Sequence, residues 1–174
     1  YTLSLQRAFG KNRLRAAQRW NDSVLQAELE GASLGTDFCT VRYEDLVDHP
    51  QTEAERICAF LEVDFVPEMV QLTRAPENIG DAKGHTEILS GNYGKYRAQM
   101  TSAEIEDVES YCVDALKSLG YDVGYPGPLK RLTSLELRRH QLGDAYRLIQ
   151  KDAETQGWMA SIESRVGHFI KVMF

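Results

Sequence analysis

The stretch that decides the fold is Val41-Arg42-Tyr43-Glu44-Asp45-Leu46-Val47. It overlaps a short β-branched and aromatic run, residues 37–43, which follows Gly35-Thr36 and predicts a β-strand. One strand cannot satisfy its own ladder hydrogen bonds, so it needs neighbouring strands that the other residues do not visibly supply. We expect these neighbours to precede Tyr1, and the chain to be a fragment of a larger domain.

Helical patterns lie on both sides of this predicted strand. Apolar residues recur at a spacing near 3.6 over residues 14–34, which predicts a long amphipathic helix ahead of it. Residues 52–61 predict a second helix behind it, with Thr52 as its N-cap and Glu55 as the reciprocal partner.

The second half of the sequence is predicted to be helical apart from one long polar loop. Residues 74–100 are rich in glycine and lack periodicity, whereas Thr101 and Glu104 form a capping box that begins a helix ending at Gly120. After Pro126-Gly127-Pro128 we expect two more helices, separated at Gly157. Their apolar stripes are Leu142, Ala145, Ile149 and Ala153, and then Met159, Ile162, Val166, Phe169, Ile170 and Met173.

Composition narrows the class of protein. The 174 residues, 43% of them hydrophobic, suit one domain with an extension. Twenty basic against 26 acidic side chains give a net charge of -6, which argues against a nucleic-acid partner but leaves room for a small anionic ligand. No apolar run is long enough to span a membrane, and the N-terminus has no signal-peptide core.

The spacing and surroundings of the cysteines indicate the cellular compartment of the protein. Cys39, Cys58 and Cys112 lack CxxC spacing and lie in apolar surroundings, so neither a zinc site nor a disulfide framework is predicted. Buried, reduced thiols favour a cytoplasmic location.

Residue spacing alone assembles no catalytic site. The sequence contains no GxxxxGK[ST] loop and no GxGxxG turn. Its four histidines are scattered, and we expect them to be structural or exposed; His85, in the glycine-rich loop, is the best exception.

Two segments are candidate binding sites. Arg42, Tyr43, Glu44 and Asp45 crowd the end of the predicted strand, where open α/β sheets bind ligands. The alternative is that Tyr43 packs under the next helix and the two carboxylates cap it. Further on, glycines, basic side chains and tyrosines in residues 83–97 could hold a phosphate and a base, or form an ordinary solvated loop.

These segments resemble sulfotransferases that use 3'-phosphoadenosine-5'-phosphosulfate (PAPS), over roughly residues 1–122. RYEDL followed by Pro50 and by Phe60-Leu61 is the strongest element. The rest of the similarity comprises Ala17-Gln18-Arg19-Trp20-Asn21, which resembles a segment of bacterial members, then Tyr93-Gly94-Lys95-Tyr96-Arg97 and Leu119-Gly120-Tyr121.

The resemblance implies a P-loop-like, three-layer α/β fold with a parallel sheet. This fragment itself would be mostly α-helical with one or two strands, residues 1–122 being the C-terminal part of the domain and residues 123–174 a helical extension. PAPS would donate a sulfuryl group to a hydroxyl or amine of a small molecule or glycan, with no metal required. The acceptor and the oligomeric state stay open, and a homo-oligomer is compatible with the sequence.

The resemblance also implies roles for individual residues. Tyr43 matches the tyrosine near the adenine, and Ser4 matches a serine that binds the 3'-phosphate. Lys83, Gly84, Lys95 and Arg97 fall in the loop that corresponds to the second 3'-phosphate and lid region. The loop departs from the family pattern in having Tyr96 where Trp is usual and in the spacing of Lys83-Gly84.

Two parts of such an enzyme have no counterpart here, namely the phosphosulfate loop and the catalytic base. The catalytic residues are therefore unknown, and we expect the isolated chain to be inactive. The alternative function is a non-catalytic helical module, derived from a sulfotransferase, that docks a partner through its C-terminal helices. Packing of those helices onto the domain is the simpler explanation of their apolar stripes.

Overall fold

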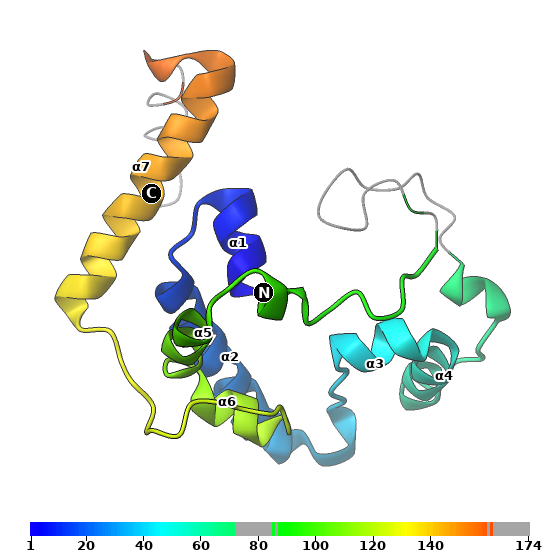
Figure 1. Ribbon diagram of the computed structural model, residues 1–174. Helices are drawn as coiled ribbons and strands as arrows, with labels where there is room; N and C mark the ends of the chain where they lie inside the picture. Colours follow the sequence, from blue (N-terminus) through cyan, green and yellow to red (C-terminus); the bar gives the residue numbers. More distant parts are fainter. Residues whose placement is uncertain (72–84, 86, 160, 162–174) are drawn as a thin grey trace. The chain divides into compact units, whose positions relative to one another are not determined.

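In a computed structural model of the chain, the structure describes residues 1–71, 85, 87–159 and 161. Every regular element within these residues is a helix (Figure 1). They are α1 (Thr2–Phe9), α2 (Arg13–Leu34), η1 (Gly35–Asp37), α3 (Tyr43–Asp48), α4 (Pro50–Phe60), η2 (Pro67–Val70), η3 (Lys95–Ala98), α5 (Ser102–Glu109), α6 (Val113–Ser118) and α7 (Ser134–Gln156). No described helix is long and apolar enough to cross a bilayer.

The described residues form two compact units. One contains residues 1–22 and the described residues from Glu106 onward, and the other contains the described residues from Ser23 to Ile105. The division falls within α2 and α5.

The prediction of a strand over residues 37–43, and of one or two strands in all, is wrong for the described residues. Phe38 and Arg42 have extended backbone angles, φ −125° with ψ 129° and φ −85° with ψ 137°, but no ladder forms beside them. The β-branched and aromatic composition favours an extended backbone, whereas a strand also requires a partner for its N–H and C=O groups. Tyr43 instead begins α3, with Glu44 and Asp45 in the first turn, where the helix dipole favours negative charge.

In the second unit, α4 holds the extended segment in place. Arg56 on α4 donates to the carbonyl oxygen of Thr40 at 2.9 Å and to Cys39 Sγ at 3.0 Å, and pairs with Glu53 at 2.7 Å. The helix predicted over residues 52–61 is present but begins at Pro50, so Thr52 is not its N-cap. The fixed φ of proline suits the first helical position, and this explains the earlier start.

The core of the first unit lies between α2 and the α5–α6 pair. Small side chains of α2, Ala16 and Ala17, are buried, as are Val113 and Ala115 of α6. Asn21 crosses this core, and its Oδ1 accepts the Ala115 N–H at 3.0 Å. The predicted long amphipathic helix over residues 14–34 is thus confirmed as α2.

The helix predicted from Thr101 to Gly120 is confirmed at its ends and wrong in its middle. The Thr101 N–H donates to Glu104 Oε2 at 2.9 Å, and the Glu104 N–H donates to Thr101 Oγ1 at 3.3 Å, which completes the capping box. At the other end Gly120 has φ 71°. Between them the helix breaks after Glu109, where the Ser110 carbonyl oxygen accepts the Lys130 N–H at 2.7 Å. A carbonyl bonded to a distant residue is less free to continue the helical ladder.

The tail contains α7, which ends at Gly157 as predicted, and the described residues just after it, Trp158, Met159 and Ser161, are helical again. Its start depends on Thr133, which forms a second capping box with Glu136 and which the sequence analysis missed. The predicted helical stripe that starts at Leu142 lies on α7. The second predicted tail helix falls almost entirely outside the described residues.

Candidate functional site

The predicted site residues are distributed over both units. Tyr43 is the first residue of α3 and 51% exposed, and Lys95 and Arg97 lie exposed in η3. All three belong to the second unit. Ser4 is exposed on α1 in the first unit. Lys83 and Gly84 lie outside the described residues.

A carboxylate on α3 organises the loop that precedes η3. Asp48 Oδ1 accepts the Ser90 hydroxyl at 2.7 Å and the Gly91 N–H at 2.8 Å, and Asp48 Oδ2 accepts the Tyr93 hydroxyl. Three donors from a loop more than 40 residues away in sequence thus converge on one side chain. In Figure 1 this segment, coloured green, runs alongside α3.

The loop then connects the two ends of the candidate site through one amide side chain. Asn92 Nδ2 donates to the Tyr43 hydroxyl oxygen at 3.2 Å, and Asn92 Oδ1 accepts from Lys95 Nζ at 2.7 Å. The structure therefore links Tyr43 and Lys95 through Asn92. Arg97 is placed differently, since its guanidinium lies over the Tyr96 ring, 5.6 Å from the centroid.

Hydrogen bonding sets the protonation of this cluster. The bond from Tyr93 lowers the pKa of Asp48 most, followed by those from Ser90 and Gly91, so Asp48 is a carboxylate at neutral pH. The same bond raises the pKa of Tyr93, and the nearby charge of Asp48, Glu44 and Asp45 adds to this effect. The Tyr93 hydroxyl is therefore a fixed donor.

The structural alternative for the RYEDL segment is right about the two carboxylates and wrong about Tyr43, whereas ligand binding there stays a prediction. Glu44 and Asp45 do lie in the first turn of a helix, as the structural alternative requires. Tyr43 is not packed under that helix, because half of its surface is exposed. An exposed tyrosine ring can stack on a base, and a neighbouring ammonium group can bind a phosphate.

Sequence reasoning missed Asp48 and Asn92. The signal for the turn was present, since Ser-Gly-Asn is a typical turn sequence and Gly91 and Gly94 adopt φ 67° and 68°. Nothing local indicated that this turn would bond to Asp48, because the contact joins residues that are distant in the chain.

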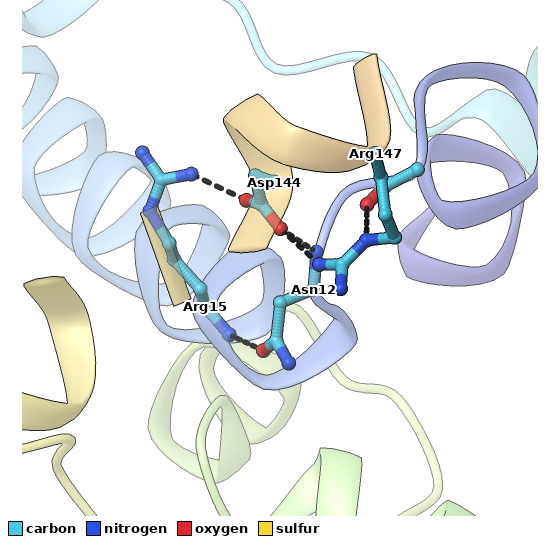
Figure 2. A network of polar contacts seen from close by, with 5 residues as sticks. Asn12, Arg15, Asp144 and Arg147 are labelled. Carbon is cyan, nitrogen blue, oxygen red and sulfur yellow. Dashed lines mark hydrogen bonds and ion pairs between the residues drawn. The ribbon is translucent and has the colours of Figure 1, made fainter. Parts of the chain in front are cut away.

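A second polar cluster, in the first unit, is structural. Asp144 on α7 is 2% exposed and accepts the Asn12 N–H at 2.8 Å, Arg15 at 2.7 Å and Arg147 at 2.6 Å (Figure 2). Arg147 also donates to the Gly10 carbonyl oxygen at 2.6 Å. A buried carboxylate needs such partners, and the cluster joins α7 to the turn between α1 and α2.

Metal ligands do not gather in the described part of the chain, where no group of three His, Cys, Asp or Glu side chains could hold an ion. His49 and His85 are exposed, and His168 lies outside the described residues. The cysteines are free, with Cys58 and Cys112 buried as predicted and Cys39 half-buried.

Comparison of the sequence with known proteins shows which protein family it is similar to. The sequence model described as "Sulfotransferase family" matches residues 2–67, which contain Ser4, Tyr43 and the whole RYEDL segment. Over this part, the chain is similar to the sulfotransferase family. The sulfotransferase resemblance seen in the residues is confirmed, whereas the bacterial type stays a prediction.

The curated proteins to which this chain is similar include carbohydrate sulfotransferase 2 of Mus musculus and of Homo sapiens. Each is 28% identical over 111 residues, covering 60% of this chain and 21% of the relative. The chain thus spans about a fifth of the length of these relatives. No solved structure matches the chain.

Proposed function

We propose that this chain contributes to PAPS binding and sulfuryl transfer in a sulfotransferase, and that it forms one wall of the nucleotide site. The sulfuryl group would pass to a hydroxyl or amine of a small-molecule or glycan acceptor, without a metal ion. Similarity to the sulfotransferase family supports the reaction class. The carbohydrate sulfotransferases among its relatives support a glycan as one acceptor class.

One observation carries the nucleotide assignment, namely the Tyr43–Asn92–Lys95 arrangement. The half-exposed Tyr43 ring offers a stacking surface for adenine. Lys95 is exposed and hydrogen-bonded to Asn92, so its ammonium group is held close to that ring and can bind a phosphate of the same nucleotide.

Calorimetry with 3'-phosphoadenosine 5'-phosphate, the product nucleotide, tests the proposal. The protein should be the longest polypeptide that contains residues 1–174, so that every wall of the site is present. We expect binding that weakens strongly when the 3'-phosphate is removed, with adenosine 5'-phosphate as the matched ligand. A protein that binds neither nucleotide at millimolar concentration would refute the nucleotide assignment.

A second candidate function, docking of a partner by the C-terminal helices, is favoured by the surface of α7. Leu135, Leu142 and Tyr146 are 77%, 74% and 56% exposed, and their spacing of seven and four residues places them on one helical face. The double substitution Leu135→Glu and Leu142→Glu should abolish any self-association or partner binding through this face, and it should leave nucleotide binding intact. Nucleotide binding therefore discriminates between the two functions.

A further inference from the structure

Asp48 is the last residue of α3 and lies two residues ahead of the first residue of α4. Its three donors, Ser90, Gly91 and Tyr93, all come from the loop rather than from the helix itself. The side chain therefore contributes to the attachment of the loop more than to the stability of α3.

The attachment of the loop to Asp48 determines how the Asn92 side chain is oriented. Ser90, Gly91 and Tyr93 are held on Asp48, and Asn92 lies between them in sequence. Fixing the residues on both sides leaves Asn92 pointing toward Tyr43 and Lys95, which it bridges. Asp48 at the end of α3 and Tyr43 at its start thus hold the same loop at two points.

We propose that Asp48 is a positioning residue that fixes the loop of residues 90–95 against α3, so that Lys95 and Tyr43 bind the same nucleotide. This inference rests on the proposed nucleotide function. Asp48 is not among the site residues indicated by the sequence, and the loop lies beyond the match to the family, which ends at residue 67. Asp48 touches no nucleotide in this proposal and acts through Asn92 and Lys95.

Preorganisation is the physical basis of the effect. A lysine on a free loop loses conformational entropy when it binds phosphate, whereas a lysine already held by Asn92 loses less. Hydrogen bonds to an ionised group are among the stronger ones in proteins, so removing the charge should release the loop.

The central test is Asp48→Asn, which preserves the size of the side chain and removes its charge and part of its acceptor capacity. Affinity for 3'-phosphoadenosine 5'-phosphate should fall roughly tenfold, as expected for the loss of charge-assisted hydrogen bonds. Tyr93→Phe removes one donor of the three and should cause a smaller loss. Asp64→Asn makes the same charge change at an exposed residue of the same unit that takes no part in these hydrogen bonds, and should bind like the wild type.

A double-mutant cycle with Lys95→Ala separates positioning from general destabilisation. If Asp48 acts through Lys95, then Asp48→Asn should have little further effect on affinity once Lys95 is removed. Additive losses would overturn the inference, as would wild-type affinity in Asp48→Asn.

Hydrogen exchange on the same samples tests the loop independently of the nucleotide. Asp48→Asn should speed amide exchange at Gly91 and in the peptide over residues 90–97, and leave α4 unchanged. If the wild type binds no nucleotide, the proposed function and the positioning role both fail, while faster loop exchange would still show that Asp48 holds the loop. If the wild type binds and Asp48→Asn binds equally well, only the positioning role fails.

Discussion

The carboxylate of Asp144 lies 2.7 Å from a guanidinium nitrogen of Arg15, although 129 residues separate them in the chain. Asp144 Oδ1 also accepts from Arg147 and from the Asn12 backbone (Figure 2). These contacts show that ion pairs and hydrogen bonds of Asp144, rather than a stripe of apolar side chains, join α7 to the start of α2.

We therefore predict that Asp144→Ala lowers the free energy of unfolding by about 2–3 kcal/mol. Loss of one partner from a buried ion pair costs more than this range, but Arg15 and Arg147 are partly exposed, and water can compensate them in part. Urea denaturation followed by circular dichroism measures the change. Asp122→Ala, at an exposed position of the same unit, is the control and should alter stability by less than about 0.5 kcal/mol.

Tyr43→Ala should weaken binding of 3'-phosphoadenosine 5'-phosphate by about 1–3 kcal/mol if its ring stacks on adenine. Tyr43→Phe retains the ring and loses only the hydroxyl that accepts from Asn92, so it should retain most of the affinity. Calorimetry gives both values. Equal losses in the two variants would show that the hydroxyl, not the ring, is what the site requires.

The Asp48–Tyr93 hydrogen bond should make loop attachment depend on pH at the alkaline end. Because the folded-state pKa of Tyr93 is raised above its ordinary value of 10.0, its contribution to stability is present below pH 10 and is lost as the pH rises through the folded-state value. The difference in absorbance near 295 nm between the wild type and Tyr93→Phe reports this titration. Asp48→Asn should move it toward pH 10, and an unmoved titration would contradict the bond.

At acidic pH, the contribution of Asp48 to stability changes with pH in the opposite direction. Its pKa is lowered from 3.8, so its contribution is present above pH 3.8 and is lost as the pH falls through the lower folded-state value. We expect the Gly91 amide signal in NMR spectra to keep its folded-state position at pH 4 and to shift at more acidic pH. In Asp48→Asn the shift should already be present at neutral pH.

Cys112 should resist alkylation. Burial and the nearby charge of Glu109 raise its pKa to about 12, so almost no thiolate exists at pH 8. Cys39 is half-buried and reachable by solvent. Iodoacetamide at pH 8 followed by mass spectrometry should label Cys39 much faster than Cys112. Comparable labelling would mean that the first unit opens readily.

The candidate site was predictable from sequence only in part. Tyr43, Lys95 and Arg97 were indicated by a motif and by a loop of glycines and basic side chains, and the structure brings Tyr43 and Lys95 together. Asp48 and Asn92 could not be predicted, since their roles arise from hydrogen bonds between α3 and a loop more than 40 residues away.

The sequence by itself determined the features that depend on neighbouring residues. The capping box of Thr101 and Glu104, the long α2 and the ends at Gly120 and Gly157 all follow from side chains within a few positions of one another. Local hydrogen bonds and backbone preferences suffice for such features.

Tertiary structure decided those features that depend on hydrogen bonds between residues distant in the chain. Phe38 and Arg42 have extended backbones without forming a strand, because no second strand bonds to this segment in the described part of the chain. The helix after Thr101 breaks where Lys130 takes the Ser110 carbonyl, and the loop of residues 90–95 is held where Asp48 accepts it. A backbone or side-chain group can satisfy only a few hydrogen bonds, so the partner that the fold brings to it determines its structure and its role.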